Sequence, residues 1–204
     1  MSDRATHWQT VYTTKAENEV SWFQENPETS LRLIRDAGAS ASSAIIDIGG
    51  GASRLVDALV AQGFRSLAVL DISAAALEVA KTRLGPKSAD VDWIVADVTK
   101  WTPARTYDIW HDRAAFHFLN QVADRDAYID RLKSAVVAGG QVVIGTFALD
   151  GPEKCSGLQV ARYDATSLAD TLGPAFALAD SFAEAHRTPW GAIQHFQFSR
   201  FRRV

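Results

Sequence analysis

The stretch Ala44-Ile45-Ile46-Asp47-Ile48-Gly49-Gly50-Gly51-Ala52-Ser53 decides how this chain of 204 residues folds. A short apolar run is followed by an acid and three consecutive glycines. Residues 54–63 then show an amphipathic helical pattern that ends at a glycine. A strand, a glycine turn and a helix in that order are typical of a nucleotide-binding corner, because glycine lets the backbone approach a ligand closely and accepts positive φ.

The detail of this turn argues against a dinucleotide ligand. A G-x-G-x-x-G turn would place its third glycine at position 54, where this chain has Arg54. Asp47, two residues before the first glycine, is better placed to accept a hydrogen bond from a ligand ammonium than to face a pyrophosphate. The turn therefore favours a ligand that carries an ammonium group.

The rest of the chain alternates between strand-like and helix-like segments. Further buried-type strands are predicted at residues 66–73, 91–98, 107–110 and 141–147. Helices are predicted at residues 27–37, 74–84, 127–135 and 166–172, a turn at Gly139-Gly140, and a loop over 150–157. Two strand-like runs, 176–185 and 193–201, predict a terminal hairpin. We therefore expect an α/β fold with a single Rossmann-like, doubly wound sheet of seven strands, mostly parallel, with an antiparallel C-terminal hairpin strand.

Two more acids stand at predicted strand ends. Asp71 lies roughly 20 residues beyond the glycine turn, a position suited to holding two ribose hydroxyls. Asp97 ends the third strand, where its carboxylate can accept a hydrogen bond from an adenine amino group while Val98 packs against the ring. Helix capping or a turn explains either acid alone. Three acids at three successive strand ends favour a ligand site.

The segment after the fourth predicted strand is dense in reactive side chains. It runs His111-Asp112-Arg113-Ala114-Ala115-Phe116-His117, and in a doubly wound sheet it lies beside the first strand at the topological switch point. Ligands and chemistry concentrate there, so we interpret the segment as functional. The alternative is that the two histidines are structural.

The N-terminal region carries an unusual number of aromatic residues. Trp8 and Tyr12 are spaced to share one face of a short helix. This helix either packs on the edge of the domain or forms a lid that walls a pocket. We predict one domain over residues 1–204, with a helical lid segment at 1–38 and a Rossmann-like core at 39–204.

Composition excludes several classes of protein. The net charge of −3 gives no broad electrostatic footprint for nucleic acid. One cysteine excludes an internal disulfide and fits a reducing compartment. No apolar run approaches the roughly 20 residues of a membrane helix, and the N-terminus has no signal-peptide core. We expect a cytoplasmic protein, a monomer or weak dimer, with neither nucleic acid nor membrane as partner and no metal cluster.

With these landmarks in place, the chain resembles class I S-adenosylmethionine-dependent methyltransferases over essentially its whole length. Within them it is most similar to the thiopurine and tellurite-resistance methyltransferase group. The features that carry this resemblance are Trp8 and Tyr12 with Phe23-Gln24, the run I-W-H-D-R-A-A at 109–115, Gly151-Pro152, and H-R-T-P-W-G at 186–191. The commoner run lacks the inserted His111.

The resemblance implies roles for individual residues. Residues that would hold S-adenosylmethionine are Trp8, Tyr12, Asp47, Gly49, Gly51, Asp71, Ile72, Asp97, Val98 and Asp112. Residues that would meet the substrate are Trp22, Arg113, Phe116, His117, Cys155, His186 and Trp190, and the charge of Arg162 makes it a further candidate for substrate binding. Asp112, Arg113 and His117 would take part in catalysis.

These observations lead to one main hypothesis about function and three alternatives. The main one is a methyltransferase for a small-molecule acceptor: a thiol, another soft nucleophile or a carboxylate, with Arg113 and Arg162 steering an anionic substrate. A protein-lysine N-methyltransferase is the alternative, in which His117 or His111 would deprotonate the amine. A dinucleotide-binding reductase and a non-catalytic binding module are also considered, and Arg54 and the intact set of strand-end acids argue against them.

Overall fold

The computed structural model describes residues 3–204, which form one seven-stranded sheet and a small separate hairpin. The strands are β1 (Ala44–Ile48), β2 (Ser66–Asp71), β3 (Val91–Val95), β4 (Tyr107–Arg113), β5 (Val136–Phe147), β6 (Lys154–Cys155), β7 (Leu158–Gln159), β8 (Phe176–Arg187) and β9 (Ile193–Arg203). The α-helices are α1 (Asp3–Thr14), α2 (Glu28–Asp36), α3 (Leu55–Ala61), α4 (Ala74–Leu84), α5 (Val122–Ala135) and α6 (Ala165–Leu172). Short 3-10 helices are η1 (Glu17–Glu19), η2 (Gly85–Asp90) and η3 (Phe116–Phe118).

The large sheet confirms the predicted doubly wound topology. Its strand order is β3-β2-β1-β4-β5-β9-β8, in which β1 to β5 pair in parallel and β9 is antiparallel to both of its neighbours. The β1–β2 register aligns Ile48 with Leu70, so the residues that come next, Gly49 and Asp71, lie at the same edge of the sheet. The carboxyl ends of β1 to β4 therefore meet at one edge, where open α/β sheets bind ligands.

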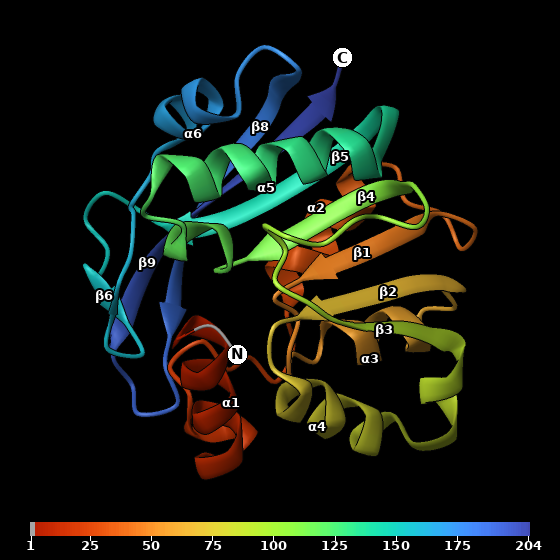
Figure 1. Ribbon diagram of the computed structural model, residues 1–204, viewed down its shortest axis with the longest axis vertical. Helices are drawn as coiled ribbons and strands as arrows, with labels where there is room; N and C mark the ends of the chain where they lie inside the picture. The colour runs from red at the N-terminus through yellow and green to blue at the C-terminus, as the bar shows by residue number, and fades with distance from the viewer. Residues whose placement is uncertain (1–2) are drawn as a thin grey trace.

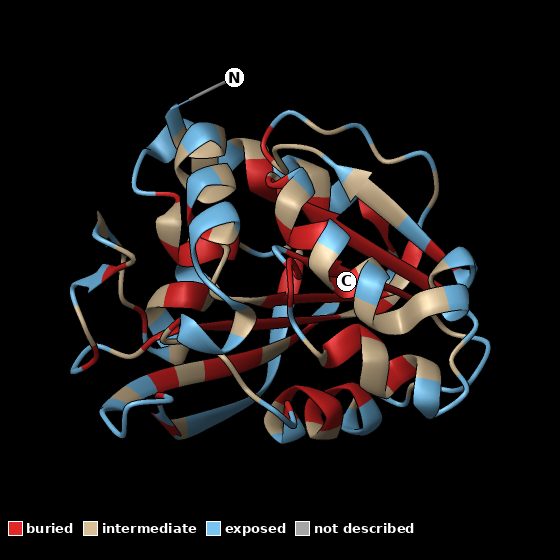
Figure 2. Cartoon of the chain, turned by 90° about the horizontal axis from the view of Figure 1, so that it is seen from below, coloured by how far each residue is buried: buried red, intermediate tan, exposed pale blue. Residues whose placement is uncertain are grey.

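Helices cover both faces of this sheet (Figure 1). On one face, α5 packs against β5, and α6 packs against β8 and β9, through a core that includes Trp110, Tyr128 and Leu168. On the other face, α2, α3 and α4 pack through a core that includes Leu31 and Leu59. Figure 2 shows the consequence: the strands between the helical layers are mostly buried, and the outward helix faces are exposed. A strand buried on both faces is predominantly apolar, which is why residues 44–46 and 67–70 form continuous apolar runs.

Three local predictions need correction. The Gly139-Gly140 pair does not make a turn but lies inside β5, where Gly139 takes a φ of +76° and the β4–β5 register shifts between Tyr107 and Ile109. The glycines thus allow a bulge within a continuous strand. Helix α5 begins at Val122, five residues before the predicted start; the prediction missed the first turn because these residues are largely exposed and carry no apolar pattern. The loop over 150–157 contains β6, and its cysteine is buried.

The N-terminal helix α1 lies on the side of the sheet to which the arrowheads of β1 and β2 point, next to α4 (Figure 1). Gln9 ties the two helices together, because its Oε1 accepts hydrogen bonds from the Ser73 hydroxyl at 3.1 Å and the Ala75 amide at 3.2 Å. Helix α2, by contrast, contributes Leu31 and Ile34 to the core. Every helix in the described part of the chain falls short of the length and apolarity needed to cross a membrane.

Candidate functional site

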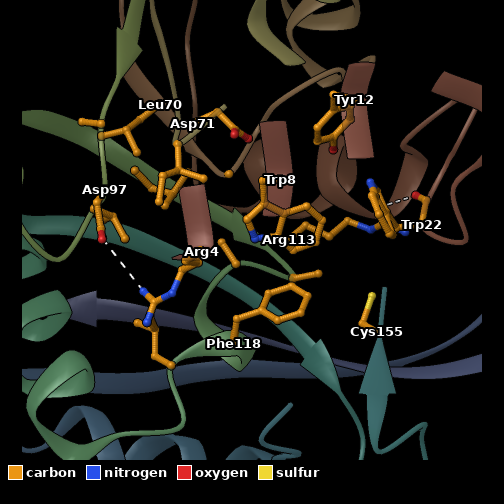
Figure 3. Close-up of a pocket in the computed structure, with 18 residues that line it drawn as sticks. Arg4, Trp8, Tyr12, Trp22, Leu70, Asp71, Asp97, Arg113, Phe118 and Cys155 are labelled. Carbon is orange, nitrogen blue, oxygen red and sulfur yellow. Dashed lines mark hydrogen bonds and ion pairs between the residues drawn. The ribbon is translucent and has the colours of Figure 1, made fainter. Parts of the chain in front are cut away.

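A cavity opens at the carboxyl edge of β1 to β4, between the strand ends and α1 (Figure 3). Its volume is about 740 Å³ when the open mouth is included. The strand ends contribute Ile48, Gly49, Leu70, Asp71, Ile72, Ala96, Asp97, Val98, Arg113, Ala114 and Ala115. The other lining residues are Arg4, Trp8, Tyr12, Trp22, Phe118, Leu119 and Cys155. Asp71 and Asp97 stand at one end, while Trp22, Arg113 and Cys155 stand at the other (Figure 3).

Asp71 is a buried acid at the tip of β2. Its Oδ1 accepts a hydrogen bond from the Ser73 amide at 2.8 Å. Burial raises the pKa of Asp71 to about 7, and the nearby charge of Asp47 adds to the effect. A Cβ on Gly51 would come within 2.9 Å of Asp71 Oδ2, so the turn has room for this carboxyl only because position 51 is glycine. A ligand that donates hydroxyl hydrogen bonds would satisfy the buried carboxylate.

Asp97 begins a tight turn after β3. Its Oδ1 accepts hydrogen bonds from the Thr99 amide at 3.0 Å and the Thr99 hydroxyl at 2.7 Å, and it lies 4.0 Å from Nη1 of Arg4. Ile72 and Val98 supply an apolar wall beside it. This end of the cavity thus combines a fixed carboxylate with a flat apolar surface, which suits a heteroaromatic ring with an amino group.

Helix α1 forms the wall opposite the strand ends. Arg4, Trp8 and Tyr12 recur at intervals of four residues, so they share one helix face, and all three line the cavity. The ring centroid of Trp8 lies 5.6 Å from that of Trp22 and 5.0 Å from that of Phe118. The sequence predicted Trp8, Tyr12 and Trp22 but missed Arg4 and Phe118. The spacing of Arg4 before Trp8 would have found the arginine.

Arg113, at the end of β4, lines the cavity with a guanidinium that forms no ion pair within residues 3–204. Nη1 donates to the Trp22 backbone oxygen at 2.8 Å, and the group lies 5.1 Å from the Phe196 ring centroid. The buried Nε and Nη2 atoms have no hydrogen-bond partner among residues 3–204. Burial lowers the pKa of Arg113 to about 10, although the charge of Glu184, which accepts from Gln24, opposes the shift. A buried cation left unpaired is costly, so this end of the cavity suits an anion.

Three other predicted residues near Arg113 lie in the core and not in the cavity. Asp112 is fully buried on the opposite face of β4, where its carboxylate accepts hydrogen bonds from the Ala115 amide at 2.8 Å and the Tyr128 hydroxyl at 2.7 Å. Phe116 is also fully buried and packs against Tyr128. Burial lowers the pKa of the His117 imidazole to about 3, and the charge of Arg113 adds to this shift. His117 is therefore uncharged at neutral pH and does not line the cavity.

The remaining predicted substrate residues are dispersed. Cys155 lines the cavity, and burial raises the pKa of its thiol to about 11. Arg162 lies outside the cavity, where it donates to the Gly151 oxygen at 3.1 Å and pairs with Glu153. His186 hydrogen-bonds the Ser21 backbone oxygen through Nε2 at 2.7 Å, behind the cavity wall. Trp190 is 62% exposed at the turn between β8 and β9 and does not line the cavity.

Asp47 and Gly51 lie directly behind the cavity surface. Asp47 is buried beneath the glycine turn and hydrogen-bonds His111, while Gly51 separates Asp71 from the Tyr12 hydroxyl. Gly49 is the glycine of the turn that faces the cavity directly. Within residues 3–204, no group of three or more His, Cys, Asp or Glu side chains is arranged to hold a metal ion.

Comparison with known proteins identifies part of this architecture. Residues 45–140 match a family model described as a methyltransferase domain. A segment of 79 residues, 39% of the chain, is 34% identical to malonyl-acyl-carrier-protein O-methyltransferase 1 of Ilyobacter polytropus. That segment spans 28% of the length of this relative.

Solved structures show the same fold over almost the whole chain. The N-methyltransferase NodS of Bradyrhizobium japonicum, solved with S-adenosylhomocysteine, is 18% identical with a TM-score of 0.73, over 96% of this chain and 97% of that one. A 1,6-didemethyltoxoflavin N1-methyltransferase of Burkholderia thailandensis is 18% identical with a TM-score of 0.72, over 98% of this chain and 87% of that one. At this identity the likeness concerns the fold.

Proposed function

We propose that this chain transfers a methyl group from S-adenosylmethionine to a small-molecule acceptor that bears an anionic or soft nucleophilic group. The match of residues 45–140 to a methyltransferase domain and the fold shared with a methyltransferase solved with S-adenosylhomocysteine support the reaction type. The observation that carries the acceptor class is the guanidinium of Arg113: this residue lines the end of the cavity away from Asp71 and Asp97, and its buried Nε and Nη2 have no hydrogen-bond partner among residues 3–204.

The residues around the cavity fit S-adenosylmethionine. Asp71 would accept hydrogen bonds from the ribose hydroxyls, and Asp97 with Ile72 and Val98 would hold the adenine. Gly49 lets the turn that would meet the methionine part pack closely against Ala115, because an added Cβ at this position would lie 2.7 Å from the Ala115 Cβ. Trp8 and Tyr12 would cover the cofactor from α1.

The acceptor would occupy the aromatic end of the cavity. Trp8, Trp22 and Phe118 supply apolar surface, and Arg113 supplies the charge. Bound S-adenosylmethionine offers an electrophilic methyl group on a sulfonium, which a nucleophile takes by in-line displacement. The residues of this chain contribute positioning and exclusion of water, which is worth roughly 7–11 kcal/mol in favourable cases. Arg113 would also favour the ionised form of a thiol or carboxylate.

The alternative of a protein-lysine methyltransferase is less well supported. A lysine side chain enters as a cation and needs a base or nearby carboxylates. The acceptor end provides Arg113 and aromatic rings, and the lining acids, Asp71 and Asp97, stand at the cofactor end. The two histidines that a base mechanism would use, His111 and His117, do not line the cavity. A thiolate or carboxylate needs no base in the site.

The experiment that tests this proposal uses S-adenosylmethionine with a labelled methyl group. The purified protein is incubated with three defined acceptors: an aryl thiol, an aryl carboxylate and an N-acetyl-lysine amide. A parallel reaction with a cell lysate is separated into small molecules and macromolecules. We expect label on the thiol or carboxylate and in the small-molecule fraction. Label confined to the lysine amide and to protein bands would overturn the proposal. Whether the chain belongs to the thiopurine and tellurite-resistance group is decided by the same panel with a thiopurine added.

A further inference from the structure

A buried chain of three polar side chains lies behind the glycine turn. The Asp47 carboxylate on β1 hydrogen-bonds Nδ1 of His111 on β4 through Oδ1 at 2.7 Å. Nε2 of the same ring is 2.9 Å from the Ser30 hydroxyl on α2. The exposed fractions of Ser30, Asp47 and His111 are only 1%, 4% and 2%. Polar groups this deeply buried are costly unless each one is satisfied, so the arrangement is specific.

The second carboxylate oxygen of Asp47, Oδ2, lies beneath the glycine turn. Oδ2 faces the turn, where a Cβ added to Gly50 would come within 2.5 Å of it. Among residues 3–204, no group donates a hydrogen bond to Oδ2. The ring of His111 therefore engages one oxygen and leaves the other free beneath the glycine turn. A ligand with an N–H or O–H group could donate the hydrogen bond that Oδ2 lacks.

We infer that Ser30 and His111 are positioning residues that hold the Asp47 carboxylate for the ammonium group of the amino-acid part of S-adenosylmethionine. The inference rests on the proposed function for the identity of the ligand. An ammonium carries three N–H donors and a positive charge, which match an unpaired carboxylate oxygen. Asp47 itself was expected to hold the methionine end, but the two residues behind it were not.

The direction of the hydrogen bonds explains why both residues are needed. A carboxylate only accepts, so Nδ1 of His111 donates to Asp47. The other ring nitrogen, Nε2, is held by a hydrogen bond with the Ser30 hydroxyl, which fixes the plane of the ring. Without Ser30 the ring can rotate, and the carboxylate loses its orientation. The β1–β4 register, which places Asp47 opposite His111, makes the contact possible.

A purely structural role for the hydrogen-bonded residues Ser30, His111 and Asp47 predicts a different effect of their replacement. The three residues would then stabilise the packing of α2 on the sheet, and their replacement would affect all cofactor analogues equally. The two roles can be separated because 5′-methylthioadenosine has the adenine, ribose and sulfur of the cofactor but no amino-acid part.

The test compares the affinities of S-adenosylhomocysteine and 5′-methylthioadenosine by isothermal titration calorimetry. We expect Ser30→Ala to raise the Kd of S-adenosylhomocysteine by about fivefold, and His111→Asn by a similar factor, because one hydrogen bond of the network is lost. The Kd of 5′-methylthioadenosine should change by less than about twofold, because this ligand has no amino-acid part. Asp47→Asn should raise the first Kd by more than about tenfold, and adding Ser30→Ala to it should have no further effect, since the residues act as one unit. Ser199→Ala, another fully buried serine, on β9, is the matched control and should change neither Kd.

Three outcomes are informative. Selective loss of S-adenosylhomocysteine affinity in the Ser30 and His111 variants supports the inference. Equal loss of both ligands, or no loss of either, overturns it, and thermal melts of each variant show that the folded protein was measured. If the unaltered protein binds neither ligand, the proposed function itself fails, and this outcome is distinct from failure of the positioning residues alone.

Discussion

Nη1 of Arg113 donates a hydrogen bond to the backbone oxygen of Trp22 at 2.8 Å, and this bond joins the end of β4 to the segment that follows η1. It uses one nitrogen of the guanidinium and fixes the plane of the group, while Nε and Nη2 lack partners in the described part of the chain. An unpaired cation of this kind lowers the stability of the folded protein, because its charge is removed from water without a partner. The same cation favours binding of an anionic ligand, so its effects on stability and on binding have opposite signs.

Replacing Arg113 should therefore damage activity and improve stability. We expect Arg113→Met to lower kcat/KM for the acceptor by about 100-fold or more, because a buried charge partner is lost. The same change should raise the free energy of unfolding by about 1 kcal/mol, since an unpaired charge leaves the interior. Steady-state kinetics and urea unfolding measure the two effects. Arg187→Met, at an exposed arginine on β8, is the control and should alter neither. A Kd for S-adenosylhomocysteine that rises as steeply as the acceptor effect would instead assign Arg113 to the cofactor.

The pKa of Asp71 predicts a pH-dependent affinity for the cofactor product. In the free protein burial raises this pKa to about 7, so the carboxyl is increasingly protonated below that pH. Ribose hydroxyls stabilise the ionised form, and binding must then release the proton. The Kd of S-adenosylhomocysteine should be constant above pH 7 and rise by up to about tenfold per pH unit below it. Calorimetry between pH 5.5 and 8.5 measures this profile.

Asp71→Asn should weaken binding at pH 8 and remove the slope, whereas Asp92→Asn, at an exposed acid on β3, should leave the profile intact. The raised pKa also affects stability without ligand. The folded chain binds more protons than the unfolded chain between the ordinary pKa of 3.8 and about 7. The contribution of Asp71 is therefore fully present below that window and is lost as the pH rises through it. A slope that survives in Asp71→Asn would assign it to another group.

Glu17 should control how long the cofactor product stays bound. It accepts from Nη2 of Arg54 at 2.6 Å and also pairs with Arg83, which ties the segment after α1 to the glycine turn and α4. Glu17→Gln should raise the dissociation rate of S-adenosylhomocysteine by about twofold to fivefold, since part-buried pairs of this kind contribute roughly 0.5–1 kcal/mol. Stopped-flow measurement of tryptophan fluorescence follows the release. Glu78→Gln breaks an exposed pair with Lys81 and should leave the rate unchanged. An unchanged rate in Glu17→Gln would show that the ion pairs of this segment do not limit release.

Gly50 should be intolerant of any side chain. An added Cβ would lie 2.5 Å from Asp47 Oδ2 and 2.7 Å from Val69 Cγ1. Gly50→Ala should lower the free energy of unfolding by about 1–3 kcal/mol and weaken S-adenosylhomocysteine binding by about tenfold or more, because both contacts must move. Gly63→Ala is a contrasting control: its Cβ would meet nothing within 4 Å, but its φ is +86°. It should cost about 1 kcal/mol of stability and leave binding intact. Full binding by Gly50→Ala would show that the turn is not packed against the ligand.

Local sequence patterns determined the order of the elements and the position of the site. The glycine turn after β1, the acids Asp71 and Asp97, and helix α4 at residues 74–84 follow from apolar runs, turn residues and capping, which act over a few neighbouring residues. Once the elements alternate as strand and helix, the handedness of their connections leaves one arrangement in which those acids share an edge. The same reasoning placed Trp8 and Tyr12 on one face of a helix.

Only the tertiary structure decided which side chains face the cavity. His111, Asp112 and Arg113 are consecutive, but successive side chains of a strand point to opposite faces. Asp112 therefore enters the core beneath α5, while Arg113 reaches the cavity and His111 meets Asp47 and Ser30. The register between β1 and β4 and the packing of α2 create these contacts, and both depend on residues far away in the chain. A dense run of reactive residues indicates a site, but burial and pairing across elements determine which of them can bind a ligand.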